Sequence, residues 1–214
     1  MRESIKQFAK IAAETLPISD PIYEFGSFQV PGQEELADLR PLFPDKKYIG
    51  ADLREGPGVD VVLNLHDINL PSESVGTAFC LDTLEHVEYP RKAIDELHRV
   101  LKQNGMLIIS SSMNFPIHDF PYDFWRFTPD AFKSLLKPFT QAFVDFAGDN
   151  EFPHTVVGVG FKDAISENVM NGLAERIKLW KESFTIVPGK SWKRLLKITV
   201  SPIRFAIYRR VSKE

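Results

Sequence analysis

The sequence is poor in cysteine and has no long apolar run. Its one cysteine, Cys80, cannot form an internal disulfide or, by itself, a thiolate metal site. No apolar stretch approaches the roughly 20 residues that a membrane-spanning helix needs. Residues 1–16 alternate charged side chains with short apolar stretches, unlike a secretory signal. These absences predict a cytoplasmic protein, and no metal ligands are expected.

Positive charge is scarce in most of the chain and concentrated at its end. Eight basic residues and one acidic residue between Lys190 and Glu214 give this segment a formal charge of +7. The rest of the chain therefore has a formal charge of −10, and the two parts sum to the net charge of −3. An acidic body argues against a nucleic-acid partner, because neutralising phosphates requires clustered lysine and arginine. The basic segment is interspersed with aromatic and apolar residues. It either docks on its own domain or makes peripheral contact with the anionic inner face of a membrane.

Apolar runs of strand length alternate with helical patterns along most of the chain. The run at 106–110 is almost wholly apolar, which indicates burial on both faces and therefore a parallel sheet covered by helices. The alternation predicts an open α/β sheet with right-handed crossovers, closed by an antiparallel hairpin. Expected strands span 22–25, 47–52, 59–63, 75–81, 106–110, 141–147 and 155–161; expected helices span 1–15, 33–39, 128–136 and a segment from Pro90 that Asn104 and Gly105 close.

The chain is long enough for one good-sized domain and an appendage. We expect the domain at residues 1–165 and a basic, amphipathic C-terminal extension at residues 166–214. The oligomeric state is not predicted.

Three expected strands end in residues suited to a ligand. Ligands of an open α/β sheet bind beyond the carboxyl ends of its strands. Gly26 would let backbone approach a ligand closely, and the Asp52 carboxylate can accept hydrogen bonds from both hydroxyls of a ribose. After the third strand, Asp67 and Ile68 could hold the amine and the face of adenine. Each residue could equally belong to an ordinary turn or strand-end cap, so none identifies a ligand alone.

Five segments stand in a distinctive order. They are Y-E-F-G-S (23–27), Y-I-G-A-D-L (48–53), H-D-I-N-L-P (66–71), L-D-T-L-E-H-V (81–87) and L-H-R-V-L-K-Q-N-G (97–105). This set resembles the class I S-adenosylmethionine-dependent methyltransferase family, most closely its bacterial group with a leucine-glutamate-histidine segment after the fourth strand. The similarity covers about residues 22–138. It implies a doubly wound, mostly parallel seven-stranded sheet of the Rossmann-like methyltransferase type, with a C-terminal helical extension.

The resemblance also implies a site for the cofactor S-adenosylmethionine. Glu24 and Gly26 should line its methionine and ribose side, and Asp52 should hold the ribose. Asp67 and Ile68 should hold adenine. The expected cofactor site further includes Ser27, Leu53, Leu81 and Asp82.

The loop after the first expected strand departs from the family pattern. Phe28 and Val30 stand where relatives usually carry two further glycines, which puts the path of the loop in doubt. A dinucleotide fold needs glycines there to admit a pyrophosphate. Their absence disfavours NAD more than it disfavours S-adenosylmethionine, which has no phosphates. A catalytically silent binding module on the same fold stays open as the alternative to an enzyme.

The most unusual stretch of the sequence, residues 114–127, follows the fifth expected strand. It mixes aromatic and polar side chains, so it could wall off a pocket for a methyl acceptor. We expect Tyr122, Trp125 and Arg126 to contact the substrate. In the alternative, the stretch is a buried connection in which Arg126 pairs with Asp123.

Two histidines are the catalytic candidates. His118 is the better candidate for a general base, because imidazole titrates near neutral pH and its loop should overlie the reacting methyl group. His86 follows the fourth expected strand and could face the substrate or cap the next helix. The acceptor is expected to be an oxygen or nitrogen atom on a small-molecule or glycan-type substrate.

Overall fold

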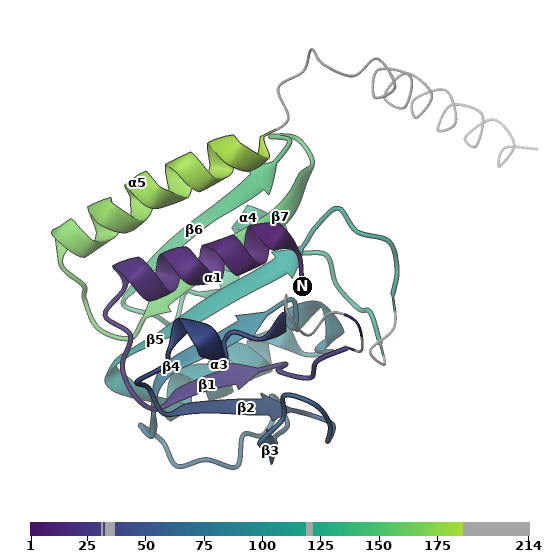
Figure 1. The fold of residues 1–214 in the computed structure, drawn as a ribbon, viewed down its shortest axis with the longest axis vertical. Helices are drawn as coiled ribbons and strands as arrows, with labels where there is room; N and C mark the ends of the chain where they lie inside the picture. The colour runs from purple at the N-terminus through teal and green to yellow at the C-terminus, as the bar shows by residue number, and fades with distance from the viewer. Residues whose placement is uncertain (31, 33–36, 119–121, 186–214) are drawn as a thin grey trace, which may run out of the picture.

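The fold is built on one sheet of seven strands among the residues that the structure, a computed structural model, describes: 1–30, 32, 37–118 and 122–185 (Figure 1). The strand order is β3-β2-β1-β4-β5-β7-β6, and β7 runs antiparallel to both of its neighbours while the other paired strands are parallel. The predicted doubly wound, mostly parallel sheet is therefore confirmed. The strands are β1 (Ile22–Phe25), β2 (Tyr48–Asp52), β3 (Val61–Val62), β4 (Val75–Leu81), β5 (Leu101–Ser112), β6 (Gln141–Gly148) and β7 (Pro153–Phe161).

Helices cover both faces of the sheet. Figure 1 shows α1 and α5 side by side on the near face, with α3 behind the strands. The side chains of β4 are buried throughout and divide between the two faces: Phe79 packs on the side of α1 and α5, and Cys80 on the side of α3 and α4. The helices are α1 (Glu3–Thr15), α3 (Pro90–Val100), α4 (Pro129–Leu135) and α5 (Glu167–Phe184), with short 3-10 turns η1 (Arg40–Leu42) and η2 (Leu84–His86).

The apolar spacing of α1 explains its position. Ile5, Phe8 and Ala12 recur at helical intervals and are fully buried, so one stripe of the helix docks on the sheet. The Trp180 indole of α5 donates a hydrogen bond to the Ser4 carbonyl at 2.8 Å, which joins the two helices. The Ser4 hydroxyl also lies 2.9 Å from the Thr155 hydroxyl, and Thr155 pairs with Ser112, so α1 begins close to the carboxyl end of β5.

The expected end of the helix beginning at Pro90 was wrong. α3 ends at Val100, and β5 begins at the next residue and runs to Ser112. Gly105 lies inside this strand, close to a register shift between β4 and β5, and a Cβ there would lie 2.8 Å from the Lys102 carbonyl oxygen. The Asn-Gly pair that suggested a helix end instead allows an irregularity in the strand.

Two other expected elements differ in extent. The strand expected at 59–63 is reduced to β3, a two-residue edge strand. The helix expected at 33–39 falls mostly outside the described residues. The other expected strands and helices appear within a few residues of their expected bounds.

Helix α5 lies in the segment expected to form the C-terminal extension. Its side chains Leu173, Ile177 and Trp180 are buried in the core on the α1 face of the sheet. Residues 186–214, which hold the whole basic segment, lie outside the described residues, and the domain division at residue 165 stays a prediction. In the part of the chain that the structure describes, no helix has the length and apolarity to cross a membrane.

Candidate active site

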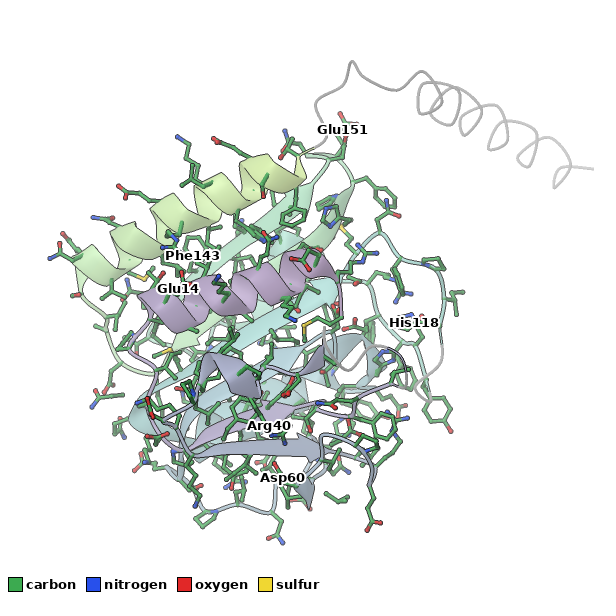
Figure 2. The ribbon with its side chains drawn as sticks, viewed as in Figure 1. Glu14, Arg40, Asp60, His118, Phe143 and Glu151 are labelled. Atoms are coloured by element: carbon green, nitrogen blue, oxygen red, sulfur yellow. The ribbon has the colours of Figure 1, made fainter. Side chains whose placement is uncertain are left out.

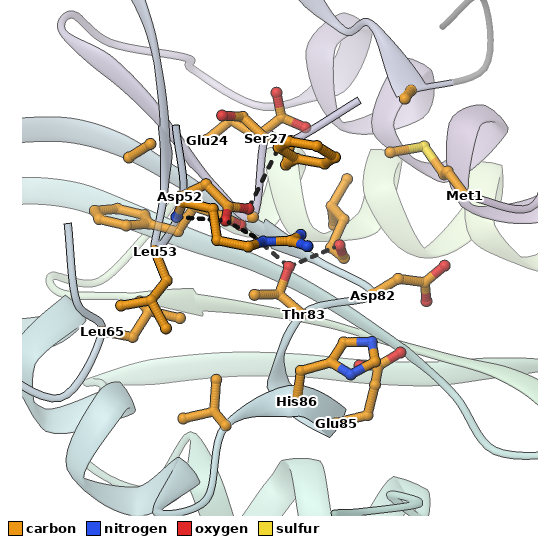
Figure 3. A pocket seen from close by; sticks show the side chains of 18 of the residues that line it. Met1, Glu24, Ser27, Asp52, Leu53, Leu65, Asp82, Thr83, Glu85 and His86 are labelled. Atoms are coloured by element: carbon orange, nitrogen blue, oxygen red, sulfur yellow. Dashed lines mark hydrogen bonds and ion pairs between the residues drawn. The ribbon is translucent and has the colours of Figure 1, made fainter. Parts of the chain in front are cut away.

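A cavity of about 630 Å³ opens beyond the carboxyl ends of β1, β2 and β4 (Figure 3). This is the edge where the polarity of an open α/β sheet places ligands, and the volume suits a small molecule. Residues 63–66 line it on one side, and Met1 and Arg2 of the N-terminal segment line it on another. Of the predicted site residues, those that line it are Glu24, Gly26, Ser27, Asp52, Leu53, Leu81, Asp82, His86, His118 and Tyr122.

Gly26 follows the last residue of β1 and lies against Thr83, which follows β4. It adopts a φ of +89°, which favours glycine, and a Cβ at this position would collide with the Thr83 hydroxyl. That hydroxyl donates to the carbonyl oxygens of Phe25 and Leu81, at 3.2 and 2.9 Å. Asp82 also has a positive φ, +47°, an uncommon conformation for a residue with a side chain. The chain therefore turns sharply where it leaves β4, on the cavity wall.

Glu24 is a buried carboxyl group on the cavity wall. Only 5% of the residue is exposed, and its carboxylate accepts a 2.7 Å hydrogen bond from the Tyr48 hydroxyl. Burial raises the pKa of Glu24 to about 7, against the opposing effect of the Tyr48 hydrogen bond. The group is thus poised to change charge near neutral pH.

The Asp52 carboxylate organises the loop that lacks the usual glycines. It accepts hydrogen bonds from the backbone N–H of Phe28 at 3.3 Å and from the backbone N–H of Arg54 at 3.0 Å. The Arg54 guanidinium lies 4.3 Å from the centre of the Phe28 ring. Phe28 therefore has a structural role, because its ring and Arg54 form part of the cavity wall.

Ser27 carries a buried polar group with no hydrogen-bond partner among the described residues. The residue is 4% exposed and lines the cavity. A buried hydroxyl without a partner is costly, and such groups are rare in folded proteins. Its position beside Gly26 and Asp52 therefore fits a polar ligand in this half of the cavity.

The predicted adenine-binding pair lies apart from the cavity lining. Ile68 is 2% exposed in the core, and its N–H donates to Glu96 at 2.9 Å. The Asp67 N–H donates to the Asn64 carbonyl at 3.0 Å within the same turn. The lining comes from residues 63–66 instead, and an adenine-binding role for the pair stays a prediction.

Asp82 and Glu85 place two acidic groups on the opposite wall. Glu85 is 1% exposed and accepts a 3.0 Å hydrogen bond from the Ser111 hydroxyl, while Asp82 is partly buried beside Ser112. Burial, and then the nearby charge of Asp82, raise the pKa of Glu85 to about 8. Burial likewise raises the pKa of Asp82, opposed by the amino terminus and by Arg2.

Arg2 ties the N-terminal segment to this wall. Its guanidinium donates to the carbonyl oxygens of His154 and Asn114, both at 2.8 Å, and lies 4.7 Å from the centre of the Phe115 ring. The sequence analysis did not identify Arg2, because its partners are more than a hundred residues away and leave no local pattern. Arg54, two residues after Asp52, does have a local sequence signal, because both follow the end of an expected strand.

The two candidate catalytic histidines lie next to each other. The rings of His86 and His118 meet edge to face with 4.8 Å between their centres. His86 Nδ1 lies 2.5 Å from the Tyr122 carbonyl oxygen, and His118 Nδ1 lies 3.2 Å from both the Pro116 carbonyl oxygen and an Asp123 carboxylate oxygen. Burial lowers the pKa of His86. Figure 2 shows His118 at the right of the view, on the segment that follows β5.

Asp123 anchors the segment that carries His118. Its carboxylate accepts the His118 backbone N–H at 2.9 Å and two hydrogen bonds from the Arg126 guanidinium at 2.5 and 2.6 Å. The Arg126 hydrogen bond holds the pKa of Asp123 well below its usual range. Trp125 donates its indole N–H to the Val87 carbonyl at 3.0 Å. Neither Trp125 nor Arg126 lines the cavity, and their contact with substrate stays a prediction.

The fold and a part of the sequence match known methyltransferases. Residues 39–109, from just before η1 to within β5, match a family described as a methyltransferase domain. A search of curated proteins finds no relative of the chain. The seven-stranded sheet is the Rossmann-like methyltransferase fold.

Solved structures share this fold at low sequence identity. An S-adenosylmethionine-dependent methyltransferase from Archaeoglobus fulgidus has a TM-score of 0.58 and 14% identity, covering 76% of this chain and 95% of the other. One from Thermotoga maritima, described as a possible histamine N-methyltransferase, has a TM-score of 0.55 and 18% identity, covering 74% and 92%. At these identities the likeness shows the fold. The family match and the fold together support S-adenosylmethionine-dependent methylation as the class of reaction.

Proposed function

We propose that this protein transfers a methyl group from S-adenosylmethionine to an oxygen or nitrogen atom of a small-molecule or glycan-type acceptor. We also propose that it belongs to the bacterial methyltransferases with a leucine-glutamate-histidine segment after the fourth strand; here that segment is η2. The observation that carries the proposal is one cavity with two unlike walls. Strand-end groups suited to a nucleoside form one wall, and titratable side chains form the other.

The first wall suits the methyl donor. A carboxylate offers about four lone-pair positions, so Asp52 can accept a ribose hydroxyl while it holds its own loop. Ser27 supplies a buried hydroxyl with no hydrogen-bond partner in the described chain. Gly26 and the turn at Thr83 keep side chains out of the space between β1 and β4. Asp52, Ser27 and Glu24 would therefore hold the donor.

The second wall suits the acceptor. When bound, S-adenosylmethionine supplies an electrophilic methyl group on a positively charged sulfur. The protein must align the acceptor atom with that methyl group and exclude water. An acceptor hydroxyl or ammonium must also lose a proton, and His118, which contacts Asp123 and lines the cavity, would receive it.

Calorimetry with S-adenosylhomocysteine tests the donor site directly. We expect the full-length protein to bind this product and not NAD. Asp52→Asn should weaken binding by about 10-fold or more, because it removes a charged hydrogen-bond acceptor. Asp145→Asn is the matched control: it alters an acid of β6 that is paired with Lys181 of α5, and the variant should bind the product as the native protein does. If the native protein takes up neither the donor nor this product, the proposed function is wrong.

We further propose a cytoplasmic protein whose basic segment contacts an anionic membrane. The support is the sequence of residues 190–210, where cationic and aromatic residues are interleaved. Full-length protein should cosediment with vesicles containing phosphatidylserine, and replacing Lys193, Arg194 and Lys197 with glutamine should reduce this. Equal sedimentation of the two proteins would refute the membrane contact.

A further inference from the structure

We propose that Glu85, His86 and His118 bind one divalent transition-metal ion in the wall of the cavity. One carboxylate oxygen of Glu85 and one ring nitrogen of each histidine all lie within 4.8 Å of one another. Two imidazoles and one carboxylate form a donor set that proteins use for zinc and for non-haem iron, with coordination positions left for other ligands. The imidazoles favour such an ion over magnesium, which prefers oxygen donors.

The spacing of the three groups is close to that of a metal site. With bonds of about 2.0–2.1 Å in a tetrahedral arrangement, donor atoms lie about 3.4 Å apart. The widest separation, at most 4.8 Å, must therefore close by up to about 1.4 Å. His118 and His86 are only partly buried, and side-chain rotation of that size is open to them, whereas Glu85 is fixed by burial and by Ser111.

Neighbouring groups orient both histidines as ligands are oriented in metal sites. A carbonyl oxygen only accepts hydrogen bonds, so the 2.5 Å contact to Tyr122 assigns the proton of neutral His86 to Nδ1. In neutral His118, the Pro116 carbonyl and the Asp123 carboxylate likewise assign the ring proton to Nδ1. In each ring Nε2 is then the nitrogen with a lone pair. A histidine held at Nδ1 by a carbonyl or carboxylate is the usual partner arrangement of a metal ligand.

The charge of this wall also favours a cation. Glu85 and Asp82 both line this wall of the cavity, and Glu85 is almost wholly buried. The amino terminus, Arg2 and Arg126 are cations close to these acids, but the Arg2 guanidinium donates to the carbonyl oxygens of His154 and Asn114, and Arg126 is paired with Asp123. Two acids close together in a low-dielectric wall are costly without compensation, and a divalent ion supplies it.

Such an ion would also narrow the class of acceptor. It would face the cavity, because Glu85, His86 and His118 all line it. An oxygen donor such as an alcohol, or two adjacent hydroxyls, would therefore be favoured over a carbon acceptor; this consequence rests on the proposed function. With the ion bound, His118 would hold the metal rather than accept a proton. No metal ligands were expected from the sequence, where the single cysteine excluded a thiolate site. The separation of His118 from Glu85 and His86 along the chain leaves no short metal-ligand spacing to recognise.

Direct ion binding tests the proposal without the methyl donor. Chelator-treated, full-length protein is titrated with ZnCl₂ by calorimetry and with CoCl₂ by visible absorption. We expect one ion per chain and cobalt bands typical of nitrogen and oxygen ligands. His118→Ala and His86→Ala should each weaken zinc binding by at least about 100-fold, and Asp123→Asn by about 10-fold, since partners of metal ligands matter less than the ligands.

Control variants separate ligand loss from unfolding. His66→Ala removes another histidine that lines the cavity, outside the three-residue cluster, and should bind zinc as the native protein does. Glu85→Gln should lose the ion while keeping the native circular dichroism. Failure of the native protein to bind either ion, or unchanged binding in both histidine variants, would overturn the proposal. If ion binding fails in this way and the metal-free protein still takes up S-adenosylhomocysteine, only the metal proposal has failed.

Discussion

The two walls of the cavity are built in different ways. On the first wall, Glu24, Gly26 and Asp52 stand at the ends of two adjacent strands, 28 residues apart along the chain at most. The second wall combines Arg2, the segment 82–86 and His118, which come from three distant parts of the chain. The first wall is thus set by strand geometry, and the second by tertiary contacts.

The walls also differ in how their acids are compensated. Asp52 accepts backbone N–H groups, and Glu24 accepts a hydroxyl, so each has a short-range partner. Glu85 and Asp82 accept hydrogen bonds from serine hydroxyls, and the charge of Asp82 adds to burial in raising the pKa of Glu85, against backbone hydrogen bonds that lower it. Residues kept in a costly arrangement are candidates for chemistry rather than for stability. This contrast supports the proposed roles, which are binding for the first wall and reactivity for the second.

The largest expected effect is that of His118→Ala on methyl transfer, and it tests whether the second wall acts in the reaction while the first wall binds the cofactor. His118→Ala should lower methyl transfer by about 10³-fold, as expected for loss of a general base or of a metal ligand, while S-adenosylhomocysteine affinity stays within a few-fold. Methyl transfer is measured as tritium moved from labelled S-adenosylmethionine into a small-molecule extract. Chelator treatment tells the two roles apart: a base works without metal, and a ligand does not. Unchanged transfer in the variant would remove His118 from the reaction.

Gly26→Ala probes the rigidity of the first wall. The added Cβ meets the Thr83 hydroxyl at a backbone φ of +89°, so we expect a loss of about 3–4 kcal/mol in unfolding free energy. Gly32→Ala is the matched control, because Gly32 has a similar φ of +82° and open space around its Cβ position. It should lose only about 1–2 kcal/mol in denaturant titrations. Equal losses would mean that the contact with Thr83 is unimportant.

Glu24→Gln tests the cost of the buried acid on the first wall. The folded protein holds the Glu24 proton up to about pH 7, whereas the unfolded chain releases it near 4.5. Stability should therefore fall as pH rises through this window, by on the order of 3 kcal/mol from this group. The glutamine stays neutral and can still accept the Tyr48 hydrogen bond. Thermal unfolding from pH 4.5 to 8 should show a shallower decline in the variant; parallel curves would contradict this.

The smallest effect concerns how the second wall is attached. Trp125→Phe removes the hydrogen bond to the Val87 carbonyl and should cost about 1 kcal/mol. The loss should appear as faster amide exchange in residues 122–128, with little change in β4. Thr128→Ala, which removes the N-cap of α4, costs about the same but should affect α4 instead. Uniform changes across the domain would show that the segment is not held locally.

Sequence reasoning succeeded where structure is local. The apolar run of β4 and the residues that follow β1 and β2 could be predicted because strand period and strand polarity decide where they lie. The same reasoning misplaced the end of α3, since an Asn-Gly pair suits either a helix end or an irregular strand. A pair between Arg126 and Asp123 was part of the alternative interpretation of residues 114–127, and the structure contains this pair. No sequence pattern could place Arg2 beside Glu85, because their proximity depends on how α1 docks.

The chain's one thiol gives it a built-in reporter. Cys80 is fully buried near the carboxyl end of β4, between β1 and β5, and burial raises the pKa of its thiol. A thiol reagent can therefore reach it only when the centre of the sheet opens. The rate of labelling would follow global opening of the domain, with no engineered probe, and would slow in proportion to the affinity of any ligand that the cavity accepts.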